Sequence, residues 1–440
     1  MRIRTCCQLA LLLAGTAVAT AATAGMAMPS ALPASLMRTL PERAAAVAAI
    51  EAQPLVLRAR GEKAAALARA DGRQRGPHDW IAGGQWQSRD AGRDGRFGEW
   101  ELSLQRGVRL PAKAGVDRRM AALELEVGAD TLADARHVAA RGLLQAWTEW
   151  LTASELVALA QAGVAIAGSD LQATATRLQS GHAAAAEHDA AVAGHASALR
   201  LLEQARLREQ EAHLALTLRH PQLALPDSAP RIAVPEDERI DWEAWANRVE
   251  VVSHDITLAE GRASLAELRA ERARLERRTD PSIGVRALNE RDGAETVLGV
   301  FVSVPLGAGP RQAVANEASA LAIAAQADAT AARLETRLRA RTLARRAALQ
   351  AAAWQQAEAA AQALAQEVGR MERGHALAGV DLADLLATRR RAAEAAMAEI
   401  EARATAFLAA ASLLLDAHAY WIDEDGHSAS EGHSAAHGQP

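Results

Sequence analysis

The residue types best suited to ligand chemistry in this 440-residue chain gather in its last segment, 421–440. Three histidines lie there among acidic residues: His427, His433 and His437. Imidazole and carboxylate groups together can bind zinc, cobalt or nickel weakly. A polar tail rich in Gly and Ser is equally typical of a disordered segment in which the histidines are incidental. The sequence therefore offers these three as candidate metal ligands, with the disordered tail as the alternative.

A second candidate pair is Asp381 and Asp384, two carboxylates where a helix is expected to begin. Acidic side chains in a first turn stabilise a helix N-terminus, which is a purely structural use for both. Enzyme signatures are absent from the sequence: there is no G-x-S-x-G, no phosphate-binding glycine loop and no H-E-x-x-H. A net charge of -5 gives no indication of nucleic-acid binding. We expect a protein that is not an enzyme and needs no cofactor.

The elements that must position these residues include two β-hairpins. Side chains alternate between apolar and other types along 296–304 and 100–110, which is strand periodicity. Asp-Gly pairs, at 94–95 and 292–293, mark the turns. We expect hairpins over 80–110 and 282–305, with strands of about ten residues, the length that a tilted strand needs to cross a bilayer.

Most of the remaining chain has helical spacing. Only 3% of its residues are aromatic and the apolar content is largely Ala, which suits long, closely packed helices. The proline-free segment 113–179 predicts a rod of roughly 100 Å. Four arginines form a ladder at spacing i, i+4 that we interpret as a solvated or tunnel-facing helix stripe: Arg333, Arg337, Arg341 and Arg345.

Landmarks recur at nearly constant offset, which indicates an internal duplication. Pro111 and Pro305 are 194 positions apart, and Gly181 and Gly374 are 193 apart. We divide the chain into a signal peptide, two repeats, a linker and a tail, at 1–24, 25–220, 221–240, 241–420 and 421–440. Each repeat holds a helix, a hairpin, a long helix, a tip and a return helix, with the tips at 180–183 and 373–380.

The N-terminus predicts export across a membrane. Arg2 and Arg4 precede an apolar stretch, 9–14, and small-residue cleavage options follow within the first 24 positions. No later apolar run looks long enough for a spanning helix. Such a chain can still enter an outer membrane as a closed barrel. Four strands cannot close alone, so two chains would supply eight strands and three would supply twelve. The alternative is a pair of soluble hairpins that cover helix ends.

Taken together, the chain resembles the outer-membrane efflux protein (TolC) family over almost its whole length. The segment GHALAGVDLADLL at 374–386 is similar to the family's second periplasmic turn, and VPLG at 304–307 to its hairpin exit. The resemblance implies a mainly α fold with a small transmembrane β part. It implies a homotrimer in which twelve strands form a barrel in outer-membrane lipid and twelve helices form a periplasmic α-barrel.

The same resemblance implies a passive exit duct that docks on a periplasmic membrane-fusion adaptor and an inner-membrane RND-type pump. Asp381 and Asp384 match acidic positions that narrow the tunnel mouth, where three copies would form carboxylate rings. Gly181 and Gly374 would permit the tip reversals, and Arg177 and Arg370 could contact the adaptor.

The segment LPAK at 110–113 is similar to the hairpin exit of the cobalt–zinc–cadmium subgroup, although Ala112 replaces its usual glycine. Divalent metal cations are therefore the expected cargo, with drugs or small organic molecules as the alternative. A periplasmic helical adaptor or scaffold is the alternative from another class.

Overall fold

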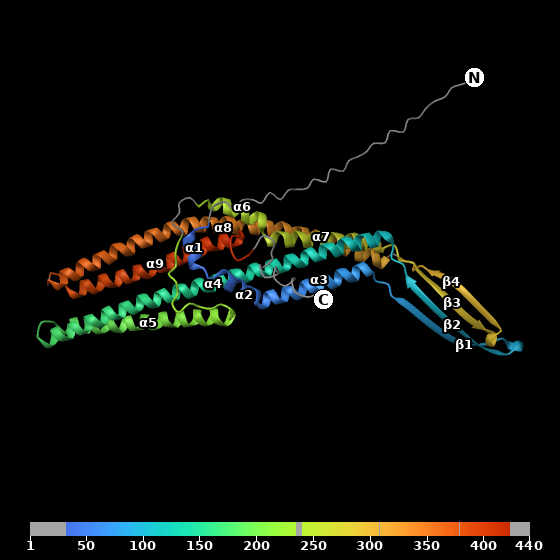
Figure 1. Cartoon of the computed structure of the whole chain (residues 1–440), viewed down its shortest axis with the longest axis horizontal. Helices are drawn as coiled ribbons and strands as arrows, with labels where there is room; N and C mark the ends of the chain where they lie inside the picture. Colours follow the sequence, from blue (N-terminus) through green and yellow to red (C-terminus); the bar gives the residue numbers. More distant parts are fainter. Residues whose placement is uncertain (1–31, 235–239, 308, 378, 423–440) are drawn as a thin grey trace, which may run out of the picture.

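The computed structural model describes residues 32–234, 240–307, 309–377 and 379–422. The proposed signal peptide and the tail histidines His427, His433 and His437 lie outside this part. The molecule is long, with helices along most of its length and a small sheet at one end (Figure 1). The expected fold class, mainly helical with four strands per chain, is confirmed.

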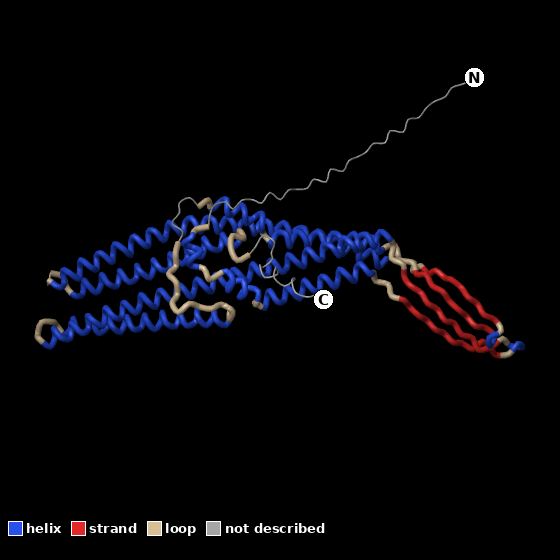
Figure 2. Tube along the Cα trace, viewed as in Figure 1, coloured by secondary structure: helices blue, strands red, loops and turns tan. Residues whose placement is uncertain are grey.

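The helices form two long hairpins, and shorter helices lie around their middle and between the middle and the sheet (Figure 2). Pro111 takes the first position of the longest helix, where its missing N–H costs nothing. Asp241 caps a shorter one by accepting a hydrogen bond from the N–H of Ala244 at 2.9 Å. The helices are α1 (Ala34–Thr39), α2 (Arg43–Glu51), α3 (Pro54–Arg75), α4 (Pro111–Gln179), α5 (Ala185–Arg219), α6 (Trp242–Val252), α7 (His254–Glu276), α8 (Gly309–Ala376) and α9 (Leu382–Asp416).

The main hydrophobic core lies where α1, α2 and α6 pack against α4 and α9. Trp245 and Phe407 are fully buried there, and the indole N–H of Trp147 donates to the carbonyl of Thr39 at 2.8 Å. The chain after α9 enters the same core, since Tyr420 and Trp421 are buried. Because Ala fills little volume, the few large side chains concentrate at this level and the helical hairpins beyond it are thin.

The sheet contains β1 (Trp80–Asp90), β2 (Arg96–Gly107), β3 (Ser282–Glu290) and β4 (Glu295–Ser303) in the order β1-β2-β3-β4. All three pairings are antiparallel, and β2–β3 joins the two hairpins across the repeats. At the turns, Asp292 Oδ1 accepts a hydrogen bond from the N–H of Gly98 at 2.6 Å, so one turn is tied to the other hairpin.

The expectation that no later segment could span a membrane as a helix is wrong by length and composition. In the part of the chain that the structure describes, α4 holds a window that is apolar enough to cross a bilayer. Scattered polar residues hid this window from a search for uninterrupted apolar runs. The helix has 69 residues, about 100 Å at 1.5 Å per residue, or roughly three times the thickness of a hydrocarbon core. Composition alone is therefore weak evidence for a span.

Candidate functional site

The strand register places apolar side chains on one face of the whole sheet. Leu104 lies opposite Val285, and Val285 lies opposite Val300, so the face continues across the β2–β3 junction. Its members are mostly exposed in the single chain: Trp80, Ala82, Trp86, Trp100, Leu102, Leu104, Ile283, Val285, Ala287, Leu298, Val300 and Val302. Charged residues on this face are Arg106, at the helix end, and Asp90 and Arg96, which are paired at the turn end. The guanidinium of Arg106 lies 5.5 Å from the ring centroid of Trp80. We call this surface the apolar sheet face.

The opposite face is largely polar. It carries Gln85, Gln87, Glu99, Glu101, Ser103, Gln105 and Arg286, with Ile81, Leu288, Val297 and Phe301 as apolar members. Gln87 Nε2 donates to Glu99 Oε2 at 3.0 Å, and Arg89 pairs with the same carboxylate. A Cβ at Gly284 would lie 2.5 Å from the Phe301 ring, so only glycine fits beneath that ring. The sheet therefore separates an apolar surface from a polar one, with period-two alternation along each strand.

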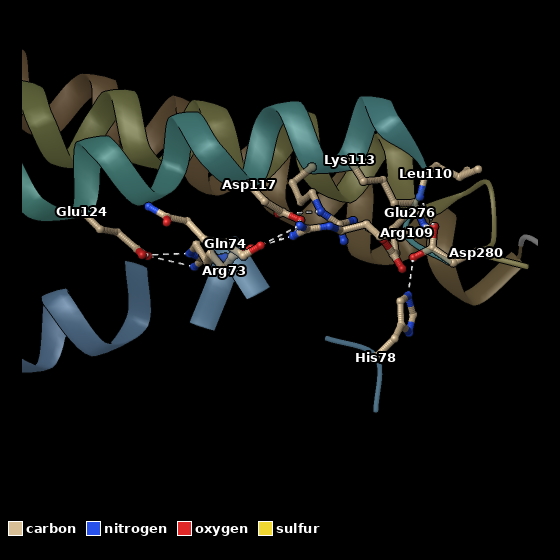
Figure 3. Close-up of polar contacts among 11 residues, drawn as sticks. Arg73, Gln74, His78, Arg109, Leu110, Lys113, Asp117, Glu124, Glu276 and Asp280 are labelled. Carbon is tan, nitrogen blue, oxygen red and sulfur yellow. Dashed lines mark hydrogen bonds and ion pairs between the residues drawn. The ribbon is translucent and has the colours of Figure 1, made fainter. Parts of the chain in front are cut away.

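A buried carboxylate fixes the base of both hairpins to the helices. Asp280, just before β3, accepts from the N–H of Leu110 at 3.1 Å, from Lys113 Nζ at 3.0 Å and from His78 Nε2 at 2.9 Å (Figure 3). Lys113 is almost completely buried and also lies 3.1 Å from Glu276. Burial alone would raise the pKa of Asp280, but these three donors hold it below its usual value.

Further along α4, two more carboxylates extend this network toward the molecular middle. Asp117 lies between Arg109, at 3.0 Å, and Arg272 of α7, at 2.8 Å. Glu124 accepts two hydrogen bonds from Arg73 at the end of α3, one from Nε and one from Nη2, each at 2.8 Å (Figure 3). These contacts join α3, the exit of β2, α4 and α7. We call the whole set the hairpin-base network: Arg73, His78, Arg109, Lys113, Asp117, Glu124, Arg272, Glu276 and Asp280.

The end opposite the sheet holds the sequence-predicted tip residues, at the α4–α5 and α8–α9 turns (Figure 1). At the first turn, Gly181 has φ +74°, a conformation that favours glycine. Arg177 donates to the carbonyl of His182 at 3.2 Å and lies 3.7 Å from Glu187, so within one chain it braces the turn.

The second turn is built differently from the expectation. Helix α8 continues to Ala376, past the expected break at 373, and Gly374 keeps a negative φ. Gly374 matters through close approach instead: a Cβ there would lie 2.7 Å from Val380 Cγ2, and its carbonyl accepts from the N–H of Gly379 at 2.9 Å. Arg370 is exposed on the same helix.

Asp381 and Asp384 lie at the beginning of α9. Asp381 occupies the N-cap position without a side-chain capping hydrogen bond, and Asp384 lies in the first turn. Both are exposed in the single chain. Since neither carboxylate is committed to a capping bond or ion pair among the described contacts, both remain available at the tip surface.

One tip residue escaped the sequence reasoning. Arg389 of α9 pairs with Asp170 of α4 and lies 2.7 Å from Glu372 of α8. It is mostly buried, whereas Glu372 is exposed. Among the described ion pairs between the two helical hairpins, Arg389–Asp170 lies nearest the tips; Arg208–Glu401 and Arg403–Glu155 lie nearer the middle. No local pattern marks it, because Asp170 is 219 positions away.

The arginine ladder on α8 is largely exposed to solvent in the single chain, as expected, and three of its members also pair with acidic residues of other helices. Arg333 lies 2.7 Å from Glu260, and Arg337 lies 2.9 Å from Glu250. Arg341 pairs with Glu243 and lies 3.2 Å from Glu250. These pairs dock α8 on an acidic row from α6 and α7.

Within the described residues, no group of three or more His, Cys, Asp or Glu is arranged to hold a metal ion. The tail histidines lie outside the described residues.

No known family profile matches this chain, and no curated protein matches it. Solved structures do. A membrane protein from Pseudomonas aeruginosa is similar with a TM-score of 0.74 and 16% identity, covering 91% of this chain and 93% of that one. The outer membrane protein VceC from Vibrio cholerae is similar with a TM-score of 0.73 and 15% identity, and the match covers 88% of this chain and 99% of VceC. The Campylobacter jejuni CmeC outer membrane channel is similar with a TM-score of 0.68 and 13% identity, and the match covers 87% of this chain and 85% of CmeC. The chain therefore has the fold of these outer-membrane proteins.

Proposed function

We propose that this chain is one subunit of an outer-membrane exit duct of a tripartite efflux pump. The observation that carries the proposal is the apolar sheet face, which continues over four strands while the opposite face is polar. Soluble proteins rarely expose so large a contiguous apolar surface. In a membrane barrel this alternation puts apolar side chains toward lipid and polar ones toward a water-filled lumen.

The free edges of the sheet require further strands. In the described chain β1 and β4 each pair on one side only. Unpaired backbone groups are too costly in lipid, so the edges must meet those of other copies. Three copies supply twelve strands, enough for a wet lumen, which is why we propose a homotrimer.

Tryptophans support a membrane position for the sheet. Trp80 lies at its helix end, whereas Trp86 and Trp100 are paired nearer the turn end. Six residues at about 3.3 Å each separate Trp80 from Trp86, roughly 20 Å along the strand. Aromatic residues concentrate at the two membrane–water interfaces, and this separation is close to the height of the apolar band in such barrels. Most of the chain would then lie in the periplasm.

The helical tips would face the pump. We propose that the α4–α5 and α8–α9 turns dock on a periplasmic membrane-fusion adaptor, through Arg177 and Arg370, and that the adaptor joins an inner-membrane RND-type pump. Three copies of Asp381 and Asp384 would place carboxylate rings at the tunnel entrance and attract cations. Divalent metal cations are the proposed cargo, with drugs or small organic molecules as the alternative.

Conductance across planar lipid bilayers tests the duct. The purified full chain, added from detergent, should give stable, passive channels in the absence of any nucleotide or gradient. A matched control replaces Leu298, Val300 and Val302 together by Glu, which puts charge on the apolar sheet face and should abolish insertion. A stable trimer that enters bilayers and never conducts would contradict the proposal.

A further inference from the structure

Three histidines meet in the middle of the molecule, far from the sheet and from the tips. His137 comes from α4, His254 begins α7, and His418 follows the end of α9. The ring centroids of His254 and His418 are stacked 4.7 Å apart, and His137 lies 5.2 Å from His418 and 6.3 Å from His254. His137 and His418 are buried and His254 is half-buried. We call these three residues the histidine joint.

The joint holds elements that are distant in sequence. His137 Nε2 donates to Asp416 Oδ1 at 3.0 Å, and Arg141 Nε donates to the same oxygen at 2.8 Å. Arg248 of α6 donates to the carbonyl of Ala417 at 2.9 Å. The end of α9 is thereby tied to α4 and to the bend between α6 and α7, and these contacts connect the two repeats.

The backbone at His418 is unusual for its residue type. Its φ is +57°, and its N–H and the N–H of Ala419 close the end of α9 by bonding to Leu415 and Leu414. Glycine or asparagine normally takes this left-handed position. A histidine there costs more backbone energy than glycine would, and a strained position of this kind points to a role for the side chain.

Within the described residues, His137 Nδ1, His254 Nε2 and both ring nitrogens of His418 are buried without a hydrogen-bond partner. A cavity of about 10 Å³ lies beside His137 and His254, with Asp134 and Thr336 also in its wall. That is room for about one water molecule, which can bring a proton to the rings. Neutral imidazoles can stack in such a site, but imidazolium ions so close to one another repel.

We propose that the histidine joint is an acid-sensitive contact between the two repeats, closed while its imidazoles are neutral and opened by their protonation. Opening would release the end of α9 and the core residues Tyr420 and Trp421 that follow it. The inference concerns conformation alone and does not depend on whether the chain conducts.

The charges around the joint favour neutral rings. Burial lowers the pKa of His254 to about 4 and that of His418 to about 3, and in both cases the neighbouring rings lower it further. Burial also lowers the pKa of His137, against the hydrogen bond to Asp416. The charged groups that face the joint come from every element packed on it: Asp134 and Arg141 of α4, Arg248 of α6, Asp255 of α7, Arg339 of α8 and Asp416 of α9.

Proton linkage sets the direction in which pH changes the stability of the closed joint. A histidine with a lowered pKa in the closed state contributes stability above its free value of 6.5 and loses it as the pH falls toward the closed-state value. Asp134 acts in the opposite direction, because burial and its contact with Asp255 raise its pKa to about 6. At pH 5 each of His254 and His418 should favour opening by roughly 30-fold, and Asp134 should oppose it by roughly 10-fold. Acid therefore opens the joint overall.

Hydrogen exchange on the full chain in detergent tests this. After correction for intrinsic exchange rates, the opening constant of segment 413–422 should rise at least tenfold from pH 7.5 to pH 5. His254→Gln with His418→Asn should remove most of that rise, since asparagine keeps the left-handed backbone. His213→Gln, an exposed histidine on α5, is the matched control and should keep it.

A rise equal in wild type and double variant would overturn the proposal, and so would no rise in wild type. Should the double variant fail to fold, NMR titration of the wild-type imidazole C–H signals decides: pKa values of His254 and His418 at 6 or above would overturn it. Protection of segment 413–422 by one equivalent of Zn²⁺ at pH 7.5, lost in the double variant, would also overturn it in favour of a metal site.

Discussion

The hairpin base and the helical tips hold the same kind of contact at opposite ends of the molecule, but with different burial. At the base, Lys113 and Asp280 have side chains that are 1% and 6% exposed. At the tips, Arg389 is 20% exposed, and its partners Asp170 and Glu372 are 17% and 43% exposed. Several carboxylates share several donors at the base, whereas nearest the tips one guanidinium, that of Arg389, joins the two helical hairpins.

The difference indicates where the chain can move. A buried, multiply bonded charge is costly to separate because its partners would be left unpaired in a low-dielectric site. A single, partly exposed ion pair costs less to separate, because water can reach both groups once they part. We therefore expect the sheet to be held rigidly on its helices while the two tips can separate, which suits a duct that is fixed in the membrane and gated at the far end.

The largest effect should come from removing the buried cation. Lys113→Met leaves Asp280 and Glu276 without it and should lower the free energy of unfolding by about 3–5 kcal/mol, measured by denaturation in detergent. Arg119→Gln is the matched control, because Arg119 and Glu271 form an exposed pair whose loss should cost about 1 kcal/mol or less. Equal costs for the two variants would contradict the distinction between base and surface.

At the tips, Arg389→Gln should widen the separation between the α4–α5 and α8–α9 turns, because Arg389–Asp170 lies nearest the tips among the described ion pairs between the two hairpins. The expected cost is smaller, about 1–2 kcal/mol. Spin labels at the two turns would report the change as a broader, longer distance distribution. Arg391→Gln is the control, since Arg391 pairs with Glu367 within the α8–α9 hairpin. An unchanged distribution in Arg389→Gln would refute the connecting role.

A smaller effect is expected from Asp381→Asn combined with Asp384→Asn. If these carboxylates line the entrance, block of the channel by Co²⁺ or Zn²⁺ should weaken by about fivefold, or about 1 kcal/mol of attraction. Single-channel currents with the divalent cation on the tip side provide the measurement. Asp189→Asn on α5 serves as the control. A block that is unchanged in the double variant would contradict the proposed carboxylate rings.

The smallest effect concerns pH at the hairpin base. Because the pKa of Asp280 is lowered, its contribution is fully present above the unfolded value of 3.8 and is lost only as the pH falls through the lower folded value. After correction for intrinsic exchange rates, the opening constant of segment 108–114 should therefore not change between pH 8 and 5. In the same samples segment 413–422 should open. Loosening of the base above pH 5 would show that the two regions do not differ in this respect.

Local signals made the fold predictable. Period-two alternation and Asp-Gly turns located the strands, and proline-free Ala-rich segments located the long helices. The polar and apolar faces also follow from alternation, since each strand carries its own pattern. What the sequence could not supply was the register that joins β2 to β3, which decides that the apolar positions of both hairpins share one face.

The contacts of single charges were beyond sequence reasoning. Asp280 binds residues 170 and 202 positions away, and His137 binds Asp416 across 279 positions, with no pattern at either end. The arginine ladder on α8 was visible in the sequence, but its acidic partners were not, because they lie on other helices. Gly374 was predicted to permit a tip reversal, and the contact that explains a glycine there, the close approach of Val380, has no local sequence signal.

The most direct test of the account is a spin-label scan along β4, from 297 to 303, in lipid bilayers. The only cysteines, Cys6 and Cys7, lie in the proposed signal peptide, so single cysteines can be introduced without background. Labels at Leu298, Val300 and Val302 should be accessible to oxygen dissolved in lipid, and labels at Val297, Gly299 and Phe301 to a water-soluble nickel reagent. Uniform access to the nickel reagent at all positions would show that the apolar sheet face does not meet lipid.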